Sequence, residues 1–330
     1  MTSDDGAARQ GVAGGQGGAA GERVAAGQGV AAGQGVDAPG GAMLGPTQFG
    51  KAEVRLLHVS RSTAQHQIKD LNVSISLAGD FAAAHLTGDN TNVLTTDAQK
   101  NTVYAFARQF GVAPIEEFGL RLARHFADVA SVDRARIRID EAPWGRIEAG
   151  YTPHPHAFER QAGIRVASVQ VWADGRSEVV AGIEGLVLLK TAGSEFRDFL
   201  QDEYTTLAPT GDRILATAVT ARWRLGGTGV DWDRSFSAAS TALREAFAIT
   251  YSRSLQQTLF AMGQAVLAAS PDVSEVRLSL PNKHHYMVDL SQFELDNPSA
   301  VFYPGDRPYG LIEGSVLRAG TPPGDPGHDW

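Results

Sequence analysis

Arg213 has the side chain and the setting of a ligand-binding residue. It follows Asp212 directly and precedes an apolar alternation that starts at Leu215. Its planar guanidinium carries a rigid fork of N–H donors, which suits a carbonyl oxygen beside a ring nitrogen on a flat ligand. The alternative is an ordinary arginine at the start of a strand, paired with a neighbouring carboxylate. The residues themselves leave both interpretations open.

Gln256 and Phe196 have the chemistry of further contacts to a flat, polar molecule. The amide of Gln256 is both a donor and an acceptor, and an aromatic ring such as that of Phe196 stacks on planar ligands. Gln257 follows Gln256 directly, so a shift by one residue stays open. On pattern alone, Gln256 is a helix-surface residue and Phe196 is a core residue.

Thr96 and Asp97 stand just before apolar helical periodicity, which predicts a helix start with Asp97 as its cap. The first turn of a helix has free backbone N–H groups and a partial positive charge, and both attract an anion.

Lys51 and His284 are able to exchange protons. A lysine at that place is usually solvated, and a lone strand histidine is usually structural. His285 beside His284 is a second candidate.

Three stretches, in this order and at these separations, resemble a known family. They are Thr95-Thr96-Asp97-Ala98-Gln99-Lys100-Asn101-Thr102, Asp202-Glu203-Tyr204-Thr205-Thr206-Leu207 running on to Asp212-Arg213, and Pro281-Asn282-Lys283-His284. Phe49-Gly50-Lys51 and Tyr309-Gly310-Leu311-Ile312 also fit. Together they resemble urate oxidase (uricase) from about residue 49 to about residue 316. The resemblance implies oxidation of urate by O₂ and water to 5-hydroxyisourate and hydrogen peroxide, a step of purine degradation, with no metal or organic cofactor.

The resemblance also assigns roles to single residues. It implies a catalytic proton relay and a larger set of substrate contacts. The relay residues are Lys51, Thr96 and His284. The substrate contacts are Thr96, Asp97, Phe196, Leu207, Arg213, Leu255, Gln256, Asn282 and Ile312. In this scheme Arg213 and Gln256 grip opposite edges of the purine, Phe196 stacks on its face, and Asn282 holds oxygen and later water above the ring. Leu207, Leu255 and Ile312 form apolar walls.

Composition excludes several other classes of protein. The 330-residue chain has a net charge of −8, which argues against a nucleic-acid surface, and no cysteine, which excludes disulfides and thiolate-bound zinc. We expect no membrane span, because no run of about 18 apolar residues occurs. His154-Pro155-His156 is a weak metal signal, since no carboxylate pair accompanies it. The C-terminus is not a peroxisomal address, so we expect a bacterial cytoplasmic enzyme.

Residues 1–45 differ from the rest of the chain. They are rich in glycine and alanine and contain no aromatic residue. We expect this head to be disordered, because it has little apolar surface to offset the entropy of ordering glycine. Gly27-Gln28-Gly29-Val30-Ala31-Ala32 imitates a dinucleotide fingerprint, but no apolar strand precedes it.

The remaining chain is long enough for two domains and shows the same order of elements twice. Alternation predicts strands over 71–77 and 136–140, and again over 215–223 and 275–280. Helical patterns cover 97–110 and a stretch opened by Pro114, and then 235–247 and 253–269. We therefore expect an α+β fold with antiparallel sheets and helices on one face. The resemblance implies two tandem tunnelling-fold domains, placed at 46–185 and 186–320, with a flexible tail at 321–330.

The resemblance implies an assembly as well. Family members form homotetramers in which paired domains close into barrels, and each site is shared between subunits. Lys51 and Thr96 would come from one subunit, while the other site residues would come from its neighbour. Two alternatives remain. One is a non-catalytic purine-binding homo-oligomer, and the other is a tunnelling-fold enzyme acting on pterins or GTP, against which the absence of cysteine counts.

Overall fold

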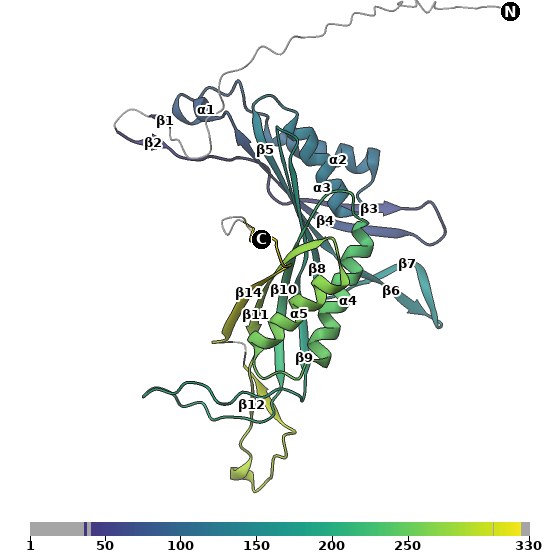
Figure 1. Ribbon diagram of the computed structural model, residues 1–330. Helices are drawn as coiled ribbons and strands as arrows, with labels where there is room; N and C mark the ends of the chain where they lie inside the picture. The colour runs from purple at the N-terminus through teal and green to yellow at the C-terminus, as the bar shows by residue number, and fades with distance from the viewer. Residues whose placement is uncertain (1–35, 38–40, 306, 325–330) are drawn as a thin grey trace, which may run out of the picture.

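The computed structural model describes residues 36–37, 41–305 and 307–324 (Figure 1). Of the expected disordered head, it therefore covers only residues 36–37 and 41–45, in which β1 (Val36–Asp37) pairs with β2 (Met43–Leu44). The rest of that prediction lies outside the described residues. In the expected flexible tail, the Gly324 N–H donates to Glu275 Oε2 over 2.8 Å and the Pro322 carbonyl accepts from Arg224.

One antiparallel sheet of eight strands organises the fold, in the order β14-β11-β10-β9-β8-β5-β4-β3. Its strands, in chain order, are β3 (Val54–Ser60), β4 (Gln67–Gly79), β5 (Val132–Ala142), β8 (Ile164–Trp172), β9 (Ser177–Lys190), β10 (Leu215–Leu225), β11 (Val273–Asn282) and β14 (Gly310–Leu317). All neighbouring pairs are antiparallel, as the α+β prediction requires.

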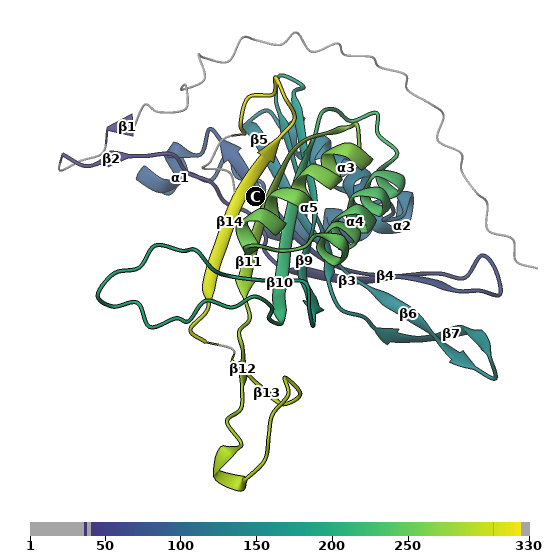
Figure 2. The ribbon, with the colours of Figure 1, turned by 60° about the horizontal axis from the view of Figure 1, so that its bottom comes forward.

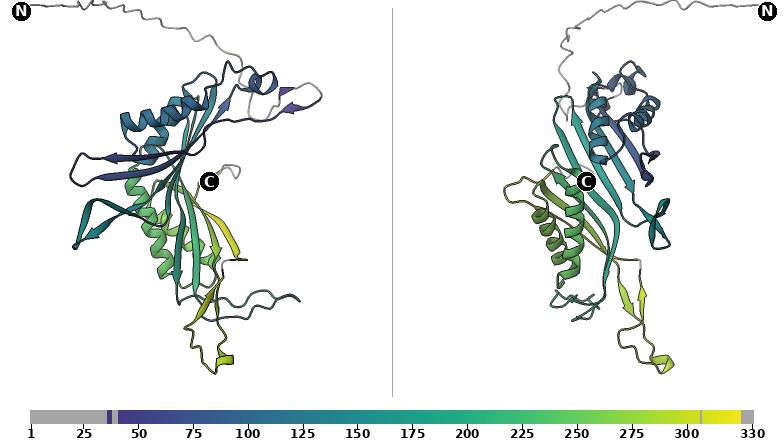
Figure 3. Two further views of the ribbon diagram at one scale, coloured as in Figure 1. Left: turned by 180° about the vertical axis from the view of Figure 1, so that it is seen from behind. Right: turned by 90° about the vertical axis from the view of Figure 1, so that its right-hand side faces the viewer.

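Four long helices lie along one side of this sheet, as Figure 1 and the view from behind in Figure 3 agree. They are α2 (Thr96–Phe110), α3 (Ile115–Ala127), α4 (Trp232–Ile249) and α5 (Leu255–Ala269); α1 (Ala82–Leu86) is a single short turn of helix. The α3 helix lies on β5 and β8, and α5 lies on β11 and β14. The second half of the chain thus repeats the arrangement of the first.

Alternation along the strands explains why the helices cover this face. Leu71, Val73, Ile75 and Leu77 of β4 are buried, whereas the serine and asparagine side chains between them are only partly buried. Side chains alternate between the two faces of a strand, so β4 presents an apolar surface to the helices. This confirms the strand predicted over 71–77.

Two helical glycines allow unusually close packing on the sheet. A Cβ atom added at Gly119 of α3 would lie 2.9 Å from a methyl group of Val169, and one at Gly263 of α5 would lie 2.5 Å from a methyl group of Val316. Both helices therefore approach their strands at positions where a larger side chain would displace its neighbour.

The helix ends correct the sequence prediction in detail. The cap of α2 is Thr95 and not Asp97, because the Thr95 side-chain oxygen accepts the Ala98 N–H over 3.1 Å from a non-helical residue. Asp97 lies inside the first turn and pairs with Lys100 at 2.6 Å. The predicted end at Gly111 is confirmed, with φ at 76°.

The second pair of helices begins at residues whose side chains cap the backbone. Asp231 caps α4, which therefore starts at Trp232, earlier than the predicted residue 235. Ser254 accepts the Gln257 N–H over 3.1 Å, so α5 starts after the predicted residue 253. In both cases the capping oxygen, rather than the apolar pattern, sets the first helical residue.

The two halves of the chain meet in the middle of the sheet. Strands β3, β4, β5 and β8 belong to the first half, and β9, β10, β11 and β14 to the second. Because β8 pairs directly with β9, the sheet is continuous, and one hydrophobic core runs through both halves. The expected domain boundary at 185/186 falls within β9. The division into two tandem domains stays a proposal.

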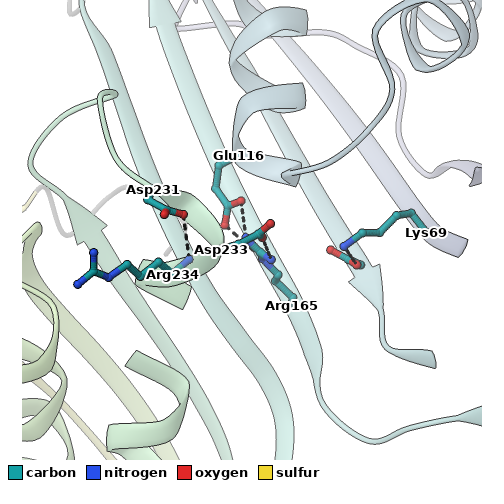
Figure 4. A network of polar contacts seen from close by, with 7 residues as sticks. Lys69, Glu116, Arg165, Asp231, Asp233 and Arg234 are labelled. Carbon is teal, nitrogen blue, oxygen red and sulfur yellow. Dashed lines mark hydrogen bonds and ion pairs between the residues drawn. The ribbon is translucent and has the colours of Figure 1, made fainter. Parts of the chain in front are cut away.

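Arg165 of β8 joins the helices of the two halves (Figure 4). Its Nη2 lies 2.8 Å from Glu116 Oε2 of α3, and its Nη1 lies 2.6 Å from Asp233 Oδ1 of α4. Its guanidinium also lies 4.4 Å from the ring centroid of Phe236. Only 1% of the Glu116 side chain is exposed. A buried carboxylate thus depends on a cation at the junction of the halves.

Two further strand pairs project from the main sheet. They are β6 (Trp144–Ala149) with β7 (Thr152–Arg160), and β12 (His285–Met287) with β13 (Phe302–Pro304), the second pair enclosing the short 3₁₀ helix η1 (Ser291–Phe293). Figure 2 shows the arm of β12 and β13 and the long connection between β9 and β10 extending beyond the sheet at the same end.

Candidate functional site

Arg213 and Phe196 lie together at the end of the second half from which that arm extends. The guanidinium carbon of Arg213 is 5.0 Å from the centroid of the Phe196 ring. Phe196 and Thr210 exchange two backbone hydrogen bonds of 2.9 Å each, which pair the segment carrying the ring with the turn carrying the arginine. Phe199 stacks on Phe196 with ring centroids 5.0 Å apart. Phe196 is therefore not simply a core residue.

The carboxylate of Asp212 binds the backbone and leaves the guanidinium of Arg213 alone. Its Oδ1 accepts the Ser194 N–H over 3.2 Å and the Arg213 N–H over 3.1 Å. Within the described part of the chain, no carboxylate lies within ion-pair distance of Arg213, and its buried Nε has no hydrogen-bond partner. Burial lowers the pKa of Arg213. The paired-arginine interpretation is thus contradicted in this chain.

The start of α5 joins the same cluster. The Glu195 N–H donates to the Ser252 carbonyl over 2.8 Å, and the Ser252 N–H donates to Gly193 over 2.9 Å. This bridge brings Leu255 and Gln256, the first two residues of α5, to the end of the sheet where Phe196 lies. Leu255 is buried and Gln256 is exposed. An exposed amide beside an apolar side chain can contact a ligand without losing an internal partner.

His284 and Asn282 reach the cluster from the end of β11. Asn282 is the last residue of β11 and lies opposite Thr217 of β10 and Gly310 of β14. Burial lowers the pKa of His284, and the positive charge of Arg213 lowers it further, so the imidazole is held neutral. The neighbouring His285 points its Nδ1 at the Lys283 carbonyl over 3.1 Å.

The two remaining apolar candidates, Leu207 and Ile312, differ in how far they are buried. Leu207 lies in the connection between β9 and β10, with 58% of its surface exposed. Ile312 of β14 lies opposite Leu280 of β11 and is partly buried against the core. Leu207 has therefore no apolar cover comparable to that of Ile312 within the described chain.

Lys51, Thr96 and Asp97 form a second, separate group in the first half. The Lys51 carbonyl accepts the Ile75 N–H of β4 over 2.9 Å, and Thr96 is the first residue of α2. The pKa of Asp97 is lowered mainly by its hydrogen bond from Lys100, and the charge of Lys51 contributes to the same shift. Lys51 thus lies within electrostatic reach of the α2 start.

One chain does not bring the two groups together. Helix α2 lies in the upper part of Figure 1, whereas β12, which begins directly after His284, lies at the bottom. The same separation appears from behind in Figure 3. The predicted relay residue His284 is therefore remote from Lys51 and Thr96 within a single subunit.

The two rings of the histidine motif contact one another. His154 and His156 of β7 have ring centroids 4.5 Å apart, and His66 lies 5.8 Å from His156. Across the described ranges, no group of three or more His, Cys, Asp or Glu side chains is arranged to hold a metal ion. None of the helices among these residues is long and apolar enough to cross a membrane.

Sequence reasoning gave no role to three residues that lie beside Phe196 or contact its neighbour. Glu195 is buried, and its Oε2 accepts the Tyr251 hydroxyl over 3.2 Å. Arg197 pairs with the same oxygen at 3.1 Å. The only available signal was that Glu195 directly precedes Phe196, since the contact with Tyr251 exists only in the folded chain.

Comparison with known proteins identifies the family. Residues 47–169 and 179–313 match the family model described as Uricase. The uricase of Arthrobacter globiformis is 50% identical over 281 residues, which cover 84% of this chain and 91% of that protein. The uricase of Dictyostelium discoideum is 38% identical over 282 residues, covering 84% and 98%.

Solved structures agree with the sequence matches. The crystal structure of the Arthrobacter globiformis uricase has a TM-score of 0.82 at 50% identity, and the match covers 86% of this chain and 98% of that one. The uricase from Bacillus fastidious has a TM-score of 0.70 at 23% identity, covering 82% and 93%, which shows a common fold. The expected α+β tunnelling fold is thereby confirmed, and the chain belongs to the uricase family.

Proposed function

We propose that this chain oxidises urate. Urate, O₂ and water are converted to 5-hydroxyisourate and hydrogen peroxide, so two electrons pass from the purine to oxygen and a hydroxyl group is added to the ring. The observation that carries the proposal is the 50% identity to a uricase over most of both chains. These uricase matches do not favour a pterin or GTP enzyme or a non-catalytic purine-binding protein.

Arg213 and Phe196 are the proposed binding elements. Urate is flat and largely a monoanion at neutral pH. The fork of Arg213, with its buried and unpartnered Nε, suits a carbonyl oxygen beside a ring nitrogen, while the Phe196 ring suits the purine face. Gln256 would bind the opposite edge, and Leu207, Leu255 and Ile312 would contribute apolar walls. Thr96 and the backbone near Asp97 would complete the set.

Proton transfer is the proposed chemical contribution of the protein. Removal of a second proton makes urate electron-rich enough to pass an electron to O₂ directly, without a cofactor. We propose that this proton leaves urate through the Thr96 hydroxyl and passes to Lys51, which is backed by His284. The neutral state of His284, held by burial and by Arg213, supports its role as an acceptor. Asn282 would hold O₂ and then water above the ring.

A complete site requires a second subunit in this proposal. Thr96 begins α2 in the first half of the chain, and this helix is remote from the end of β11 and the start of β12, where Asn282 and His284 lie. We propose that neighbouring subunits of a homotetramer supply complementary halves across two-fold interfaces, with the sheets closed into barrels. The exposed side chains of Tyr286, Met287 and Tyr303 on the arm of β12 and β13 support burial of this region in an assembly. A cytoplasmic location is part of the same proposal.

The test is an assay of the purified full-length protein. Loss of the ultraviolet absorbance of urate should match the release of hydrogen peroxide, one molecule for one. The same rate is expected after exhaustive chelation and dialysis, because the proposed reaction uses no metal or organic cofactor. Binding of urate without turnover would support the non-catalytic alternative instead, and restoration of a lost activity by a metal or flavin would contradict the cofactor-free reaction.

A further inference from the structure

Asp212 links the two segments that carry the proposed binding side chains. One carboxylate oxygen, Oδ1, accepts both the Ser194 N–H, two residues before Phe196, and the N–H of Arg213 itself. The Thr210 hydroxyl donates to the Asp212 carbonyl over 2.8 Å and closes the same turn. Asp212 therefore contacts the backbone of the segment that carries Phe196 and of the segment that carries Arg213.

The other contacts between these two segments are also backbone contacts. Phe196 and Thr210 exchange N–H···O bonds of 2.9 Å in both directions. Together with the two amides held by Asp212, these bonds hold the backbones of the two segments side by side. The guanidinium carbon of Arg213 lies 5.0 Å from the centroid of the Phe196 ring. No ion pair contributes to this spacing, because Arg213 has none among the described residues.

We infer that Asp212 is a positioning residue for substrate binding, which acts by hydrogen-bond acceptance and not by neutralising Arg213. This inference rests on the proposed function of the site. A carboxylate bound to the guanidinium would occupy the donors that a urate anion needs. A carboxylate bound to the amides instead orders the turn and leaves the fork open.

The distinction between acceptance and charge predicts different effects for two substitutions. Asparagine keeps an oxygen that can accept the two N–H groups but carries no charge. Alanine removes the acceptor and leaves both amides without their partner. Asp212→Asn should therefore keep kcat/KM for urate within about threefold of the unchanged protein, while Asp212→Ala should lower it about tenfold or more.

A matched control comes from the turn between β8 and β9. Asp174 is also exposed, and its Oδ1 accepts the Arg176 N–H over 3.0 Å, but it lies outside the proposed site. Asp174→Ala should leave kcat/KM unchanged. The constant is measured from the first-order decay of dilute urate, so weak binding does not prevent the measurement. For the Asp212 variants, the affinity for xanthine, a purine dione that lacks the C8 oxygen, is measured by calorimetry and should change in parallel with kcat/KM.

A double substitution separates positioning from general stability. If Asp212 acts through Arg213, then adding Asp212→Ala to Arg213→Ala should change kcat/KM by less than about twofold. Full additivity of the two effects would overturn the inference. So would equal damage from Asp212→Asn and Asp212→Ala, or an Asp212→Ala variant that behaves like Asp174→Ala.

Failure of this inference can be told from failure of the proposed function. If the unchanged protein binds xanthine but does not oxidise urate, the proposed activity is wrong, and the Asp212 series is decided by xanthine affinity alone. If the unchanged protein binds neither purine, both the activity and the positioning role are overturned. If it oxidises urate and the series departs from the predicted order, only the role of Asp212 is wrong.

Discussion

The guanidinium carbon of Arg213 lies 5.0 Å from the centroid of the Phe196 ring, and the buried Nε of the same arginine has no hydrogen-bond partner within the described chain. A buried donor without a partner costs free energy that a bound ligand can recover. The unpartnered Nε of Arg213 is therefore available to a bound ligand.

Replacement of Arg213 by alanine should raise KM for urate roughly a hundredfold, since two charge-assisted hydrogen bonds disappear and the anion is left unpaired. Steady-state kinetics will measure the change. The control is Arg176→Ala, because Arg176 is an exposed arginine that pairs with Asp174 at 2.7 Å outside the site. A near-normal KM for Arg213→Ala would mean that the binding of the purine edge is assigned to the wrong residue.

Lys51→Met and Thr96→Ala should mainly lower kcat, by about 10²- to 10⁴-fold, because they remove proton transfer and few ground-state contacts. The dependence of kcat on pH should change as well. Thr102→Ala is the matched control, since Thr102 lies on the same helix and its hydroxyl donates to the Ala98 carbonyl. If both variants raise KM and keep kcat, the two residues bind substrate and do not move its proton.

Acidification should destabilise the protein through His284. Burial, with Arg213 and His285 as the charged groups that face it, lowers the pKa of His284 below the ordinary value of 6.5. Between the lowered pKa and 6.5, the unfolded chain binds more protons, so stability falls as the pH falls through this window. Urea unfolding at several pH values should show a smaller loss for His284→Asn than for the unchanged protein.

The control for that experiment is His85→Asn on α1, an exposed histidine remote from Arg213. It should lose stability on acidification as much as the unchanged protein does. Equal pH dependence of the His284→Asn variant and the unchanged protein would contradict the predicted shift.

Arg165→Met should lower the free energy of unfolding by about 3–5 kcal/mol, because it leaves the buried Glu116 carboxylate without its cation. Adding Glu116→Gln should restore most of that loss, since the second change removes the unpaired charge. Denaturant unfolding will measure both variants. Arg121→Ala, which breaks a half-buried pair with Glu117 on the same helix, should cost less than about 1 kcal/mol. A harmless Arg165→Met would show that the junction does not depend on this ion pair.

Hybrid oligomers test the proposed sharing of sites. Lys51→Met and Arg213→Gln proteins should each be almost inactive. Unfolded together in equal amounts and refolded, they should regain about a quarter of the sites, because random pairing joins an intact Lys51 half to an intact Arg213 half that often. Mixing without subunit exchange is the control and should restore nothing. Inactive hybrids of confirmed composition would mean that each site lies within one chain.

The elements that sequence predicted well are those with a strong local signal. The alternation from Leu71 to Leu77 and the glycine at the end of α2 were sufficient, because side-chain direction and left-handed backbone are properties of a few neighbouring residues. The first residues of α2, α4 and α5 were predicted less well. Which oxygen caps a helix depends on the backbone just outside it, and the apolar pattern does not record that.

The sequence by itself determined the family, the candidate residues and the repeated order of elements, since motifs and periodicity are written along the chain. Tertiary structure alone decided how these residues are grouped. Arg213 lies over Phe196 because Thr210 pairs with Phe196 and because Asp212 turns to the amides rather than to the guanidinium. Lys51 and His284 are remote from one another because β8 and β9 place the two halves side by side in one sheet. Contacts between segments far apart in sequence depend on strand register and packing, and no local pattern specifies them.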